Sequence, residues 1–348
     1  MSSPSRTERR NQRGVIILWF AFILLVVLFF VALGVDGAKL ATARVQLQNA
    51  ADAAALAGAS AIDTLNGNQG KLVPAVAVVR AQQTGLLNQA MIGGDEPVAV
   101  SAADVTFPQP HQCRVVVRRE AGVGTGITTA FARVVGLPTL DLTATATAEL
   151  SPASRVCDKL VPMGAIHPST GDFQVGCQYH YSLKEGSGGG TTGNYKLLSF
   201  PQCQEGDCHG MPSTGANTMN CLVANGYGCC VEMGQVLQTE PGNKAGPFVK
   251  ALSDRFNRDN DRREGICYAD YRGNPPQERV VYVPKVSPLG NGRTDVRIEG
   301  FSAFFLTARP SGGGQNSIVG EFLYNVVPGE GGGPVGPGVT LYVIRLVH

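Results

Sequence analysis

The most constraining feature of this sequence is an uncharged apolar run that extends from Val15 to Val35. As a helix, such a run is about 30 Å long, which matches the hydrocarbon core of a bilayer. A cleaved secretory signal has a shorter apolar core with a cleavage site after it, whereas this run continues without a turn signal. A buried helix of a soluble protein is rarely apolar on every side. We therefore predict a retained transmembrane helix at residues 15–35.

The charges beside the run predict its orientation. Residues 1–14 contain four arginines and a single glutamate, and cytoplasmic segments next to a membrane span carry such an excess of positive charge. We therefore predict a cytoplasmic tail at residues 1–14 and an extracytoplasmic location for the chain after Asp36. The formal net charge of the chain is only +2 and its basic residues are dispersed, which argues against a nucleic-acid partner.

The segment after the span has the composition of a continuing helix. No proline occurs between Val15 and Val73, and strong helix formers dominate after Asp36. We expect one helix from about Val15 to Ile62, roughly 70 Å long.

Small and apolar side chains recur along this helix at steps of three and four residues, which predicts a packing face. The expected face consists of Leu47, Ala50, Ala54 and Ala57. It would allow close approach either of a helix from another subunit or of the chain's own sheet, and the sequence leaves both open.

Several motifs here are more specific than helix propensity. Arg13-Gly14 precedes the span, Asp36 stands at its outer end, and Leu47-Gln48 is followed by the run ADAAALA at Ala51–Ala57. In this order they resemble the N-terminal signature of TadE/TadG-like proteins of the tight-adherence (Tad, or Flp) pilus system. The resemblance implies a structural membrane protein. Longer TadG-like proteins carry a von Willebrand factor A domain, whose Asp-x-Ser-x-Ser metal-binding run is absent here, so the chain resembles a short form.

One departure from prepilins concerns processing. Prepilins of this class are cut after a glycine and usually carry glutamate at the fifth mature position. Cutting between Gly14 and Val15 would place Trp19 at that position, and the span contains no glutamate. We therefore predict an intact N-terminus and a retained anchor.

Downstream of the long helix, the pattern predicts a small α+β module at residues 36–151. We expect a helix at Pro74–Met91, strands at Val98–Phe107 and Cys113–Glu120, a short helix at 126–137, and a strand at Thr139–Leu150. TadE/TadG-like proteins commonly show this layout, in which the long helix packs on a small sheet.

The remainder, residues 152–348, is richer in glycine, proline, cysteine and aromatic residues. We predict a β-rich domain there, with one helix at 246–259 and glycine-rich loops at 186–194 and 328–338.

Cysteines are concentrated in this second domain. Cys113 lies outside it, and the other eight are Cys157, Cys177, Cys203, Cys208, Cys221, Cys229, Cys230 and Cys267. An even number outside the cytoplasm predicts disulfides, in any of 105 connectivities. The neighbours Cys229 and Cys230 are expected to bridge to two different partners.

Two metal sites are weaker alternatives. A zinc site from Cys203, Cys208, His209 and Cys221 would have a spacing that matches no standard finger. A calcium loop at 257–264 would place Arg262 where glycine is required. We expect no metal, cofactor or catalytic site.

These observations predict a single-pass protein of the bacterial inner membrane that acts as a structural component, minor pilin-like or pseudopilin-like, of a Tad/Flp-type pilus. Its expected partners are other pilin-like subunits and the inner-membrane Tad platform, with no small-molecule substrate. The alternative is an anchored adhesin or binding module that acts through the β-rich domain.

Overall fold

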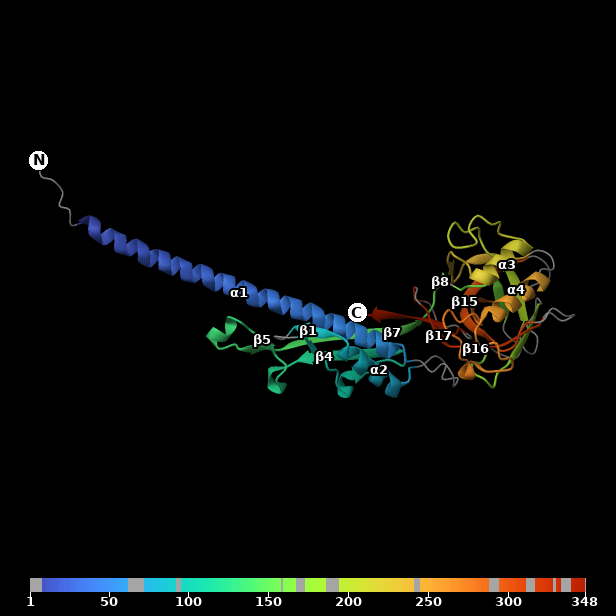
Figure 1. Cartoon of the computed structure of the whole chain (residues 1–348), viewed down its shortest axis with the longest axis horizontal. Coiled ribbons are helices and arrows are strands. Elements are labelled where there is room, and N and C mark those ends of the chain that lie inside the picture. The colour runs from blue at the N-terminus through green and yellow to red at the C-terminus, as the bar shows by residue number, and fades with distance from the viewer. Residues whose placement is uncertain are drawn as a thin grey trace, which may run out of the picture.

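The computed structural model describes residues 8–61, 72–91, 95–157, 159–166, 173–185, 194–240, 245–287, 294–310, 317–327, 330–332 and 339–347. Residues 1–7 of the predicted tail and most of the two predicted glycine-rich loops lie outside this part. Figure 1 shows a long helix, a small module along its C-terminal half, and a rounded domain beyond that end.

The helix α1, Glu8–Ala59, is continuous over 52 residues, which confirms the expectation of one long helix. It begins before Val15 and ends just before Ile62. Because α1 contains no proline and is rich in alanine and leucine, nothing in its sequence interrupts it. Its N-terminal half projects away from the rest of the chain (Figure 1).

A five-stranded sheet of order β17-β18-β7-β4-β3 lies along the C-terminal half of α1. Its strands are β3 (Val105–Thr106), β4 (Gln112–Arg119), β7 (Leu142–Pro152), β17 (Asn325–Val326) and β18 (Leu341–Val347). Strand β18 is antiparallel to β7, with Ile344 opposite Leu150. Strand β18 therefore belongs to the sheet of the module, although it lies near the C-terminus. The predicted ranges 36–151 and 152–348 both contribute strands to this sheet, and the division into these two domains remains a prediction.

The core of this module lies between α1, the sheet and the helix α2, Pro74–Leu86. Alternate side chains of β4 (Cys113, Val115 and Val117) are buried in it. They face the small residues of α1, which allow the helix to approach the sheet closely.

Two predicted elements of the module are shorter than expected. The predicted helix at Pro74–Met91 ends at Leu86, and its last residues form β1 (Gln89–Met91), which pairs with β2 (Asp95–Pro97). The predicted strand at Val98–Phe107 is a strand only at β3. Before β3, the 3-10 turn η1 (Ala102–Asp104) is capped by Ser101, whose hydroxyl oxygen accepts a hydrogen bond from the Ala103 N–H at 3.3 Å.

The predicted helix at 126–137 was wrong. The segment is a short hairpin that follows the 3-10 turn η2 (Ala121–Val123). It consists of β5 (Ile127–Thr128), the 3-10 turn η3 (Ala132–Val135) and β6 (Thr139–Leu140). Gly136 has a φ of 89°, which ends η3, and the following Pro138 cannot continue a helix.

The rounded domain is formed by the chain between β7 and β17, and we call it the outer domain. It is built on a ring of six strands. The successive pairings β15–β14, β14–β9, β9–β11, β11–β10, β10–β16 and β16–β15 close it, and β13 also joins β11 to β15. These strands are β9 (Met163–Ile166), β10 (Tyr181–Glu185), β11 (Asn194–Ser199), β13 (Val236–Thr239), β14 (Val280–Val286), β15 (Asp295–Leu306) and β16 (Ser317–Leu323). A separate pair is formed by β8 (Arg155–Val156) and β12 (Val231–Glu232).

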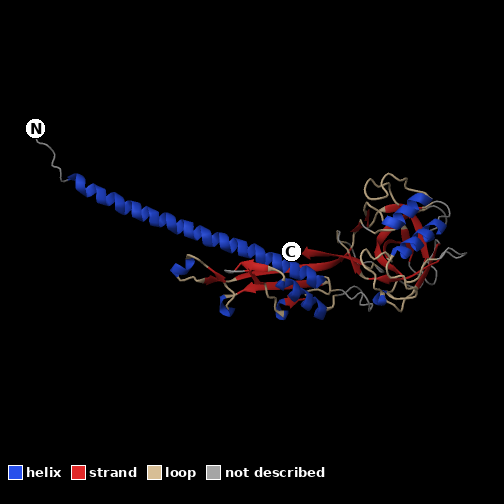
Figure 2. Cartoon of the chain, viewed as in Figure 1, coloured by secondary structure: helices blue, strands red, loops and turns tan. Residues whose placement is uncertain are grey.

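Two helices, α3 (Ala216–Asn225) and α4 (Ala245–Arg258), pack against each other and against the strands. Figure 2 shows them on one side of the outer domain. Helix α4 agrees with the predicted helix at 246–259, whereas α3 was not predicted because its asparagines and threonine are weak helix formers. A short 3-10 turn, η4 (Tyr268–Asp270), precedes β14.

Four disulfides cross-link the outer domain: Cys157–Cys230, Cys177–Cys267, Cys203–Cys229 and Cys208–Cys221. The fold class predicted from the sequence, α+β with a β-rich disulfide-bonded domain, is therefore confirmed. The neighbours Cys229 and Cys230 have different partners. The zinc alternative is contradicted, because three of its four proposed ligands are disulfide sulfurs.

Candidate functional site: the anchor helix and its junction with the module

The N-terminal half of α1 is an apolar surface without cover. In the part of the chain that the structure describes, α1 is the one helix that is long and apolar enough to cross a membrane, and its most apolar window is wholly unburied. Side chains such as Trp19, Phe22 and Leu25 are exposed. A surface this large and apolar is unfavourable in water, whereas a helix whose backbone groups are paired internally is compatible with lipid. The backbone of Gly14 and Val15 lies within α1, and the intact N-terminus that the sequence predicts stays a prediction.

The C-terminal half of α1 buries the face that the sequence predicts. Leu47, Ala50 and Ala54 are almost fully buried, and Ala57 is half-buried. Leu47, Ala50 and Ala54 belong to the core between α1, α2 and the strands β4 and β7. In this structure the chain's own module fills the face, so contacts of α1 with another subunit must use a different surface.

A second surface of α1 remains free. Ala38, Ala41, Val45 and Asn49 follow one another at helical spacing and are exposed, with Val45 exposed by 60%. This free face, as we call it, continues the exposed surface of the span past Asp36. The sequence does not predict this face, because small residues occur all around this part of the helix.

At Gly58, α1 approaches the sheet closely. A Cβ atom on Gly58 would lie 2.4 Å from the sulfur of Cys113 on β4. Cys113 is unpaired and fully buried, and burial raises the pKa of its thiol to about 11. Cys113 is therefore a packing residue at neutral pH rather than a reactive thiol.

The end of the span is joined to the module by Asp36. Its carboxylate oxygens accept hydrogen bonds from the backbone N–H groups of Ala130, Phe131 and Ala132, at 2.7, 2.9 and 2.6 Å. One turn further along α1, the ammonium group of Lys39 donates to the carbonyl oxygen and to the hydroxyl oxygen of Thr128, at 2.6 and 3.0 Å. Hydrogen bonds to a charged group are stronger than neutral ones, so Asp36 and Lys39 clamp the β5–β6 hairpin to α1.

No local signal in the sequence identifies this clamp. Asp36 contributes to the family resemblance, but its partners lie 94 to 96 residues further along the chain. Gln48 has one local and one distant partner: its amide group donates to the side chain of Asp52, four residues further along α1, at 2.8 Å and to the carbonyl oxygen of Thr145 on β7 at 3.1 Å. Only the contact with Thr145 lacks a local signal.

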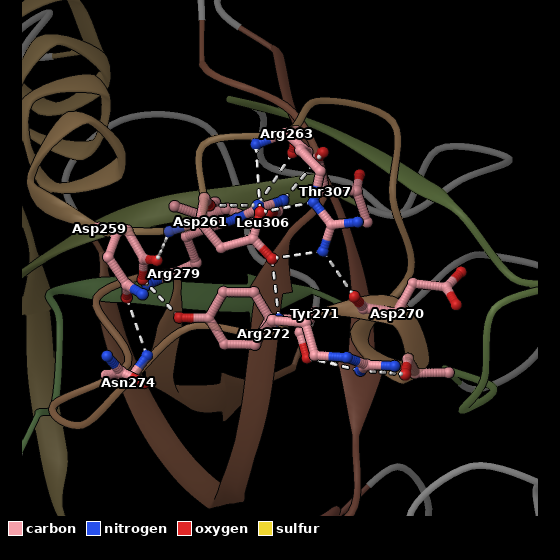
Figure 3. Close-up of polar contacts among 12 residues, drawn as sticks. Asp259, Asp261, Arg263, Asp270, Tyr271, Arg272, Asn274, Arg279, Leu306 and Thr307 are labelled. Atoms are coloured by element: carbon pink, nitrogen blue, oxygen red, sulfur yellow. Dashed lines mark hydrogen bonds and ion pairs between the residues drawn. The ribbon is translucent and has the colours of Figure 1, made fainter.

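The outer domain contains a dense polar cluster around Arg279, drawn in Figure 3. Arg279 is fully buried, and its guanidinium group lies 4.4 Å from the ring centre of Phe256 and 4.5 Å from that of Phe305. It donates to four backbone carbonyl oxygens, those of Leu306, Asp261, Arg263 and Thr307, at 2.9, 2.8, 2.9 and 3.2 Å.

Asp259 and Asp261, two aspartates of this cluster, are engaged within the protein. Asp259 accepts hydrogen bonds from the Tyr271 hydroxyl at 2.5 Å and from the Asp261 N–H at 2.8 Å. Asp261 accepts from the Arg263 guanidinium at 2.8 and 2.7 Å, and this interaction holds the pKa of its carboxyl group well below the usual range. Because these oxygens face arginine and N–H donors, the calcium alternative is contradicted. The cluster is a structural support of the outer domain.

Among the described residues, one further group has the composition of a metal site: Cys177, His180 and Cys267. Cys177 and Cys267 form a disulfide, so their sulfurs are not thiolate ligands.

Most of α1 matches a known protein family. Residues 14–61 match the family model described as "Putative Flp pilus-assembly TadE/G-like". The match includes the exposed span, Asp36 and the buried face of α1, and it confirms the resemblance for this segment. The comparison with curated proteins and that with solved structures gave no match.

Proposed function

We propose that this chain, which carries a TadE/G-like Flp pilus-assembly domain at residues 14–61, is a structural component of a Tad/Flp-type pilus, minor pilin-like or pseudopilin-like. It is held in the bacterial inner membrane by one span, with a cytoplasmic N-terminus and the bulk of the chain in the periplasm. It initiates, anchors or stabilises the pilus. Its partners are other pilin-like subunits and the inner-membrane platform.

The observation that carries this proposal is the division of α1 into two halves of opposite exposure. Residues 16–35 are apolar and almost all exposed, while the residues after Asp36 bury one face against the sheet. A single helix thus connects the bilayer to the module without a hinge, so a lateral contact made within the membrane is transmitted to the extracytoplasmic part.

Beyond the span, the free face provides a surface for lateral contact with another helix. Its residues Ala38 and Ala41 are small, which allows another helix to approach closely, and Val45 adds apolar area. The buried face with Ala54 is occupied within the chain, so a charge placed there would report on folding rather than on assembly. A charge at Val45 separates the two effects.

Deletion of the gene, followed by imaging of surface pili and by complementation, tests this function. We expect few or no pili after deletion. Wild-type protein and the control variant Val79→Arg, which changes an exposed valine of α2, should restore them, whereas Val45→Arg should not. Protein abundance and protease resistance of both variants show that each is folded.

Normal pili after deletion would contradict the proposal. If such cells had lost attachment to surfaces or to other cells, the anchored adhesin acting through the β-rich domain would be the better hypothesis. If Val45→Arg restores pili, the role of the free face is contradicted, while the proposed function of the chain is not.

A further inference from the structure

We propose that the hairpin arm, residues 127–140 with β5, η3 and β6, binds the extracytoplasmic surface of the same bilayer that α1 spans. The arm would act as a second, interfacial anchor that fixes the module against the lipid headgroups. This inference rests on the proposed membrane span of α1 and adds a lipid-binding site beside it.

The clamp lies at the depth of the outer end of the span. Asp36 is the first charged residue after the uncharged run that ends at Val35, and a run of this length fills the hydrocarbon core. The Cα–Cβ bonds of a helix tilt toward its N-terminus, so the Asp36 carboxylate is displaced toward the membrane from its own backbone. Asp36 and the backbone of residues 130–132 that it binds therefore lie at the outer boundary of the hydrocarbon.

The arm runs along α1 in the direction of the span. Thr128 is bound by Lys39, whereas Ala130 and Ala132 are bound by Asp36, one turn closer to the span. The chain thus moves toward the membrane between β5 and η3. Figure 1 shows β5 at the end of the module nearest the exposed half of α1, and Figure 2 shows a short helical turn beyond it.

The arm is held in a defined shape, as a membrane-contacting loop must be if it is to orient the module. Residues 127 and 128 pair with residues 140 and 139. Next to this pair, Thr129 donates its backbone N–H to the carbonyl oxygen of Pro138 at 3.0 Å and its hydroxyl to the carbonyl oxygen of Leu137 at 2.6 Å.

The tip of the arm, residues 131–137, exposes apolar side chains and an arginine. Phe131, Val134 and Leu137 are exposed by 48%, 84% and 51%. Arg133, which lies between them in sequence, is also exposed. An aromatic and aliphatic cluster beside an arginine suits the lipid interface, where apolar side chains enter the acyl boundary and a guanidinium group reaches lipid phosphates. Residues 130–132 of the same turn bind Asp36 at the end of the apolar span, so the cluster lies beside the span, and lipid is the occupant that we propose for it.

Depth-dependent fluorescence quenching tests the site in the full-length protein. The variant Val134→Cys is labelled with an environment-sensitive fluorophore and reconstituted into phosphatidylethanolamine–phosphatidylglycerol vesicles. The vesicles carry a nitroxide either on the headgroup or near the end of the acyl chain. Cys113 is buried, so it should not react, and wild-type protein measures any background. The control Val236→Cys changes an exposed valine of β13 in the outer domain.

We expect the label at position 134 to emit at shorter wavelength than the label at position 236, and to lose more fluorescence to headgroup nitroxide than to the deep nitroxide. Equal spectra at the two positions, without quenching, would overturn the proposal. A shorter wavelength at position 134 without quenching by either lipid would also overturn it and would indicate a protein contact.

A third label separates this inference from the proposed function. Leu25→Cys, in the exposed half of α1, should be quenched most by the deep nitroxide. If that label is not quenched, the membrane span itself fails. If it is quenched and position 134 is not, only the interfacial role of the arm fails.

Discussion

Replacement of Arg279 by methionine tests whether the polar cluster stabilises the outer domain. Methionine keeps an unbranched apolar side chain between Phe256 and Phe305, so the perturbation is mainly the loss of a charged donor rather than the creation of a cavity. The four carbonyl oxygens that Arg279 binds would lose these donors inside a buried site.

The cost follows from these contacts. The Thr307 carbonyl oxygen also accepts a hydrogen bond from the Gly265 N–H at 2.9 Å, so it stays paired. Each buried polar group left unpaired costs at least about 1 kcal/mol, so the other three carbonyls give about 3 kcal/mol. Loss of the cation also removes the Coulombic attraction between Arg279 and the carboxylates of Asp259 and Asp261. Breaking a buried charged network typically costs about 3–5 kcal/mol. Because small domains are stable by about 5–15 kcal/mol, Arg279→Met should remove a large part of the stability of the outer domain.

Urea denaturation of the detergent-solubilised protein with intact disulfides measures this loss. The single tryptophan, Trp19, lies in the span, so hydrogen exchange of the β14 and β15 amides is the better reporter. The matched control is Arg309→Met, which breaks an ion pair with Glu264 whose side chains are exposed by 48% and 52%. Such a pair is worth about 1 kcal/mol or less. Equal losses in the two variants would refute the structural role assigned to the cluster.

Three further predictions concern the anchor junction, the helix–sheet contact and acid stability. Asp36→Asn should speed hydrogen exchange of the backbone amides of residues 130–132, because a neutral amide accepts fewer and weaker hydrogen bonds. The control Asp141→Asn, whose side chain accepts a hydrogen bond from the N–H of residue 121, should leave those amides unchanged, and equal exchange in both variants would remove Asp36 from the clamp. Gly58→Ala should destabilise the module by about 1–3 kcal/mol through overpacking against Cys113, although alanine favours helix by about 1 kcal/mol. The loss should disappear in a Cys113→Ala background, and a thermal-denaturation double-mutant cycle that gives additive effects would disprove the contact. The lowered pKa of Asp261 contributes stability that is present above the unfolded-state pKa of about 4 and is lost as the pH falls toward the folded-state value. The urea concentration at the unfolding midpoint of the outer domain should therefore decrease when the pH is lowered below about 4. If this decrease is no larger in the wild-type protein than in Asp261→Asn, the assignment to Asp261 is contradicted.

Local patterns predicted the elements whose causes are themselves local. The long helix follows from helix-forming residues without proline, and α4 follows from its amphipathic spacing with Pro247 in the first turn. The hairpin at 127–140 was missed because its short apolar pattern fits a helix equally well. In the structure, the backbone N–H groups of residues 130–132 donate hydrogen bonds to Asp36. Helix propensity depends on neighbouring residues only and therefore cannot predict this contact.

The candidate site shows the same division. The buried face with Leu47 and Ala54 was predicted from periodicity, but periodicity does not state which surface covers it. The free face with Val45 became visible only once the sheet was placed. An even number of cysteines in the outer domain predicted disulfides, while their pairing depends on which β-strands and loops meet.

The sequence by itself determined that one uncharged run is long enough for a bilayer, that its helix continues beyond it, and that a cysteine-rich domain follows. These properties depend on the composition and period of neighbouring residues. Only the tertiary structure decided that β18 joins the first sheet, that Arg279 binds four carbonyl oxygens, and that Asp36 holds the arm at the end of the apolar run. The physical reason is that each of these contacts joins residues far apart in the chain, and their free energy arises only after the intervening chain has folded and brought them together.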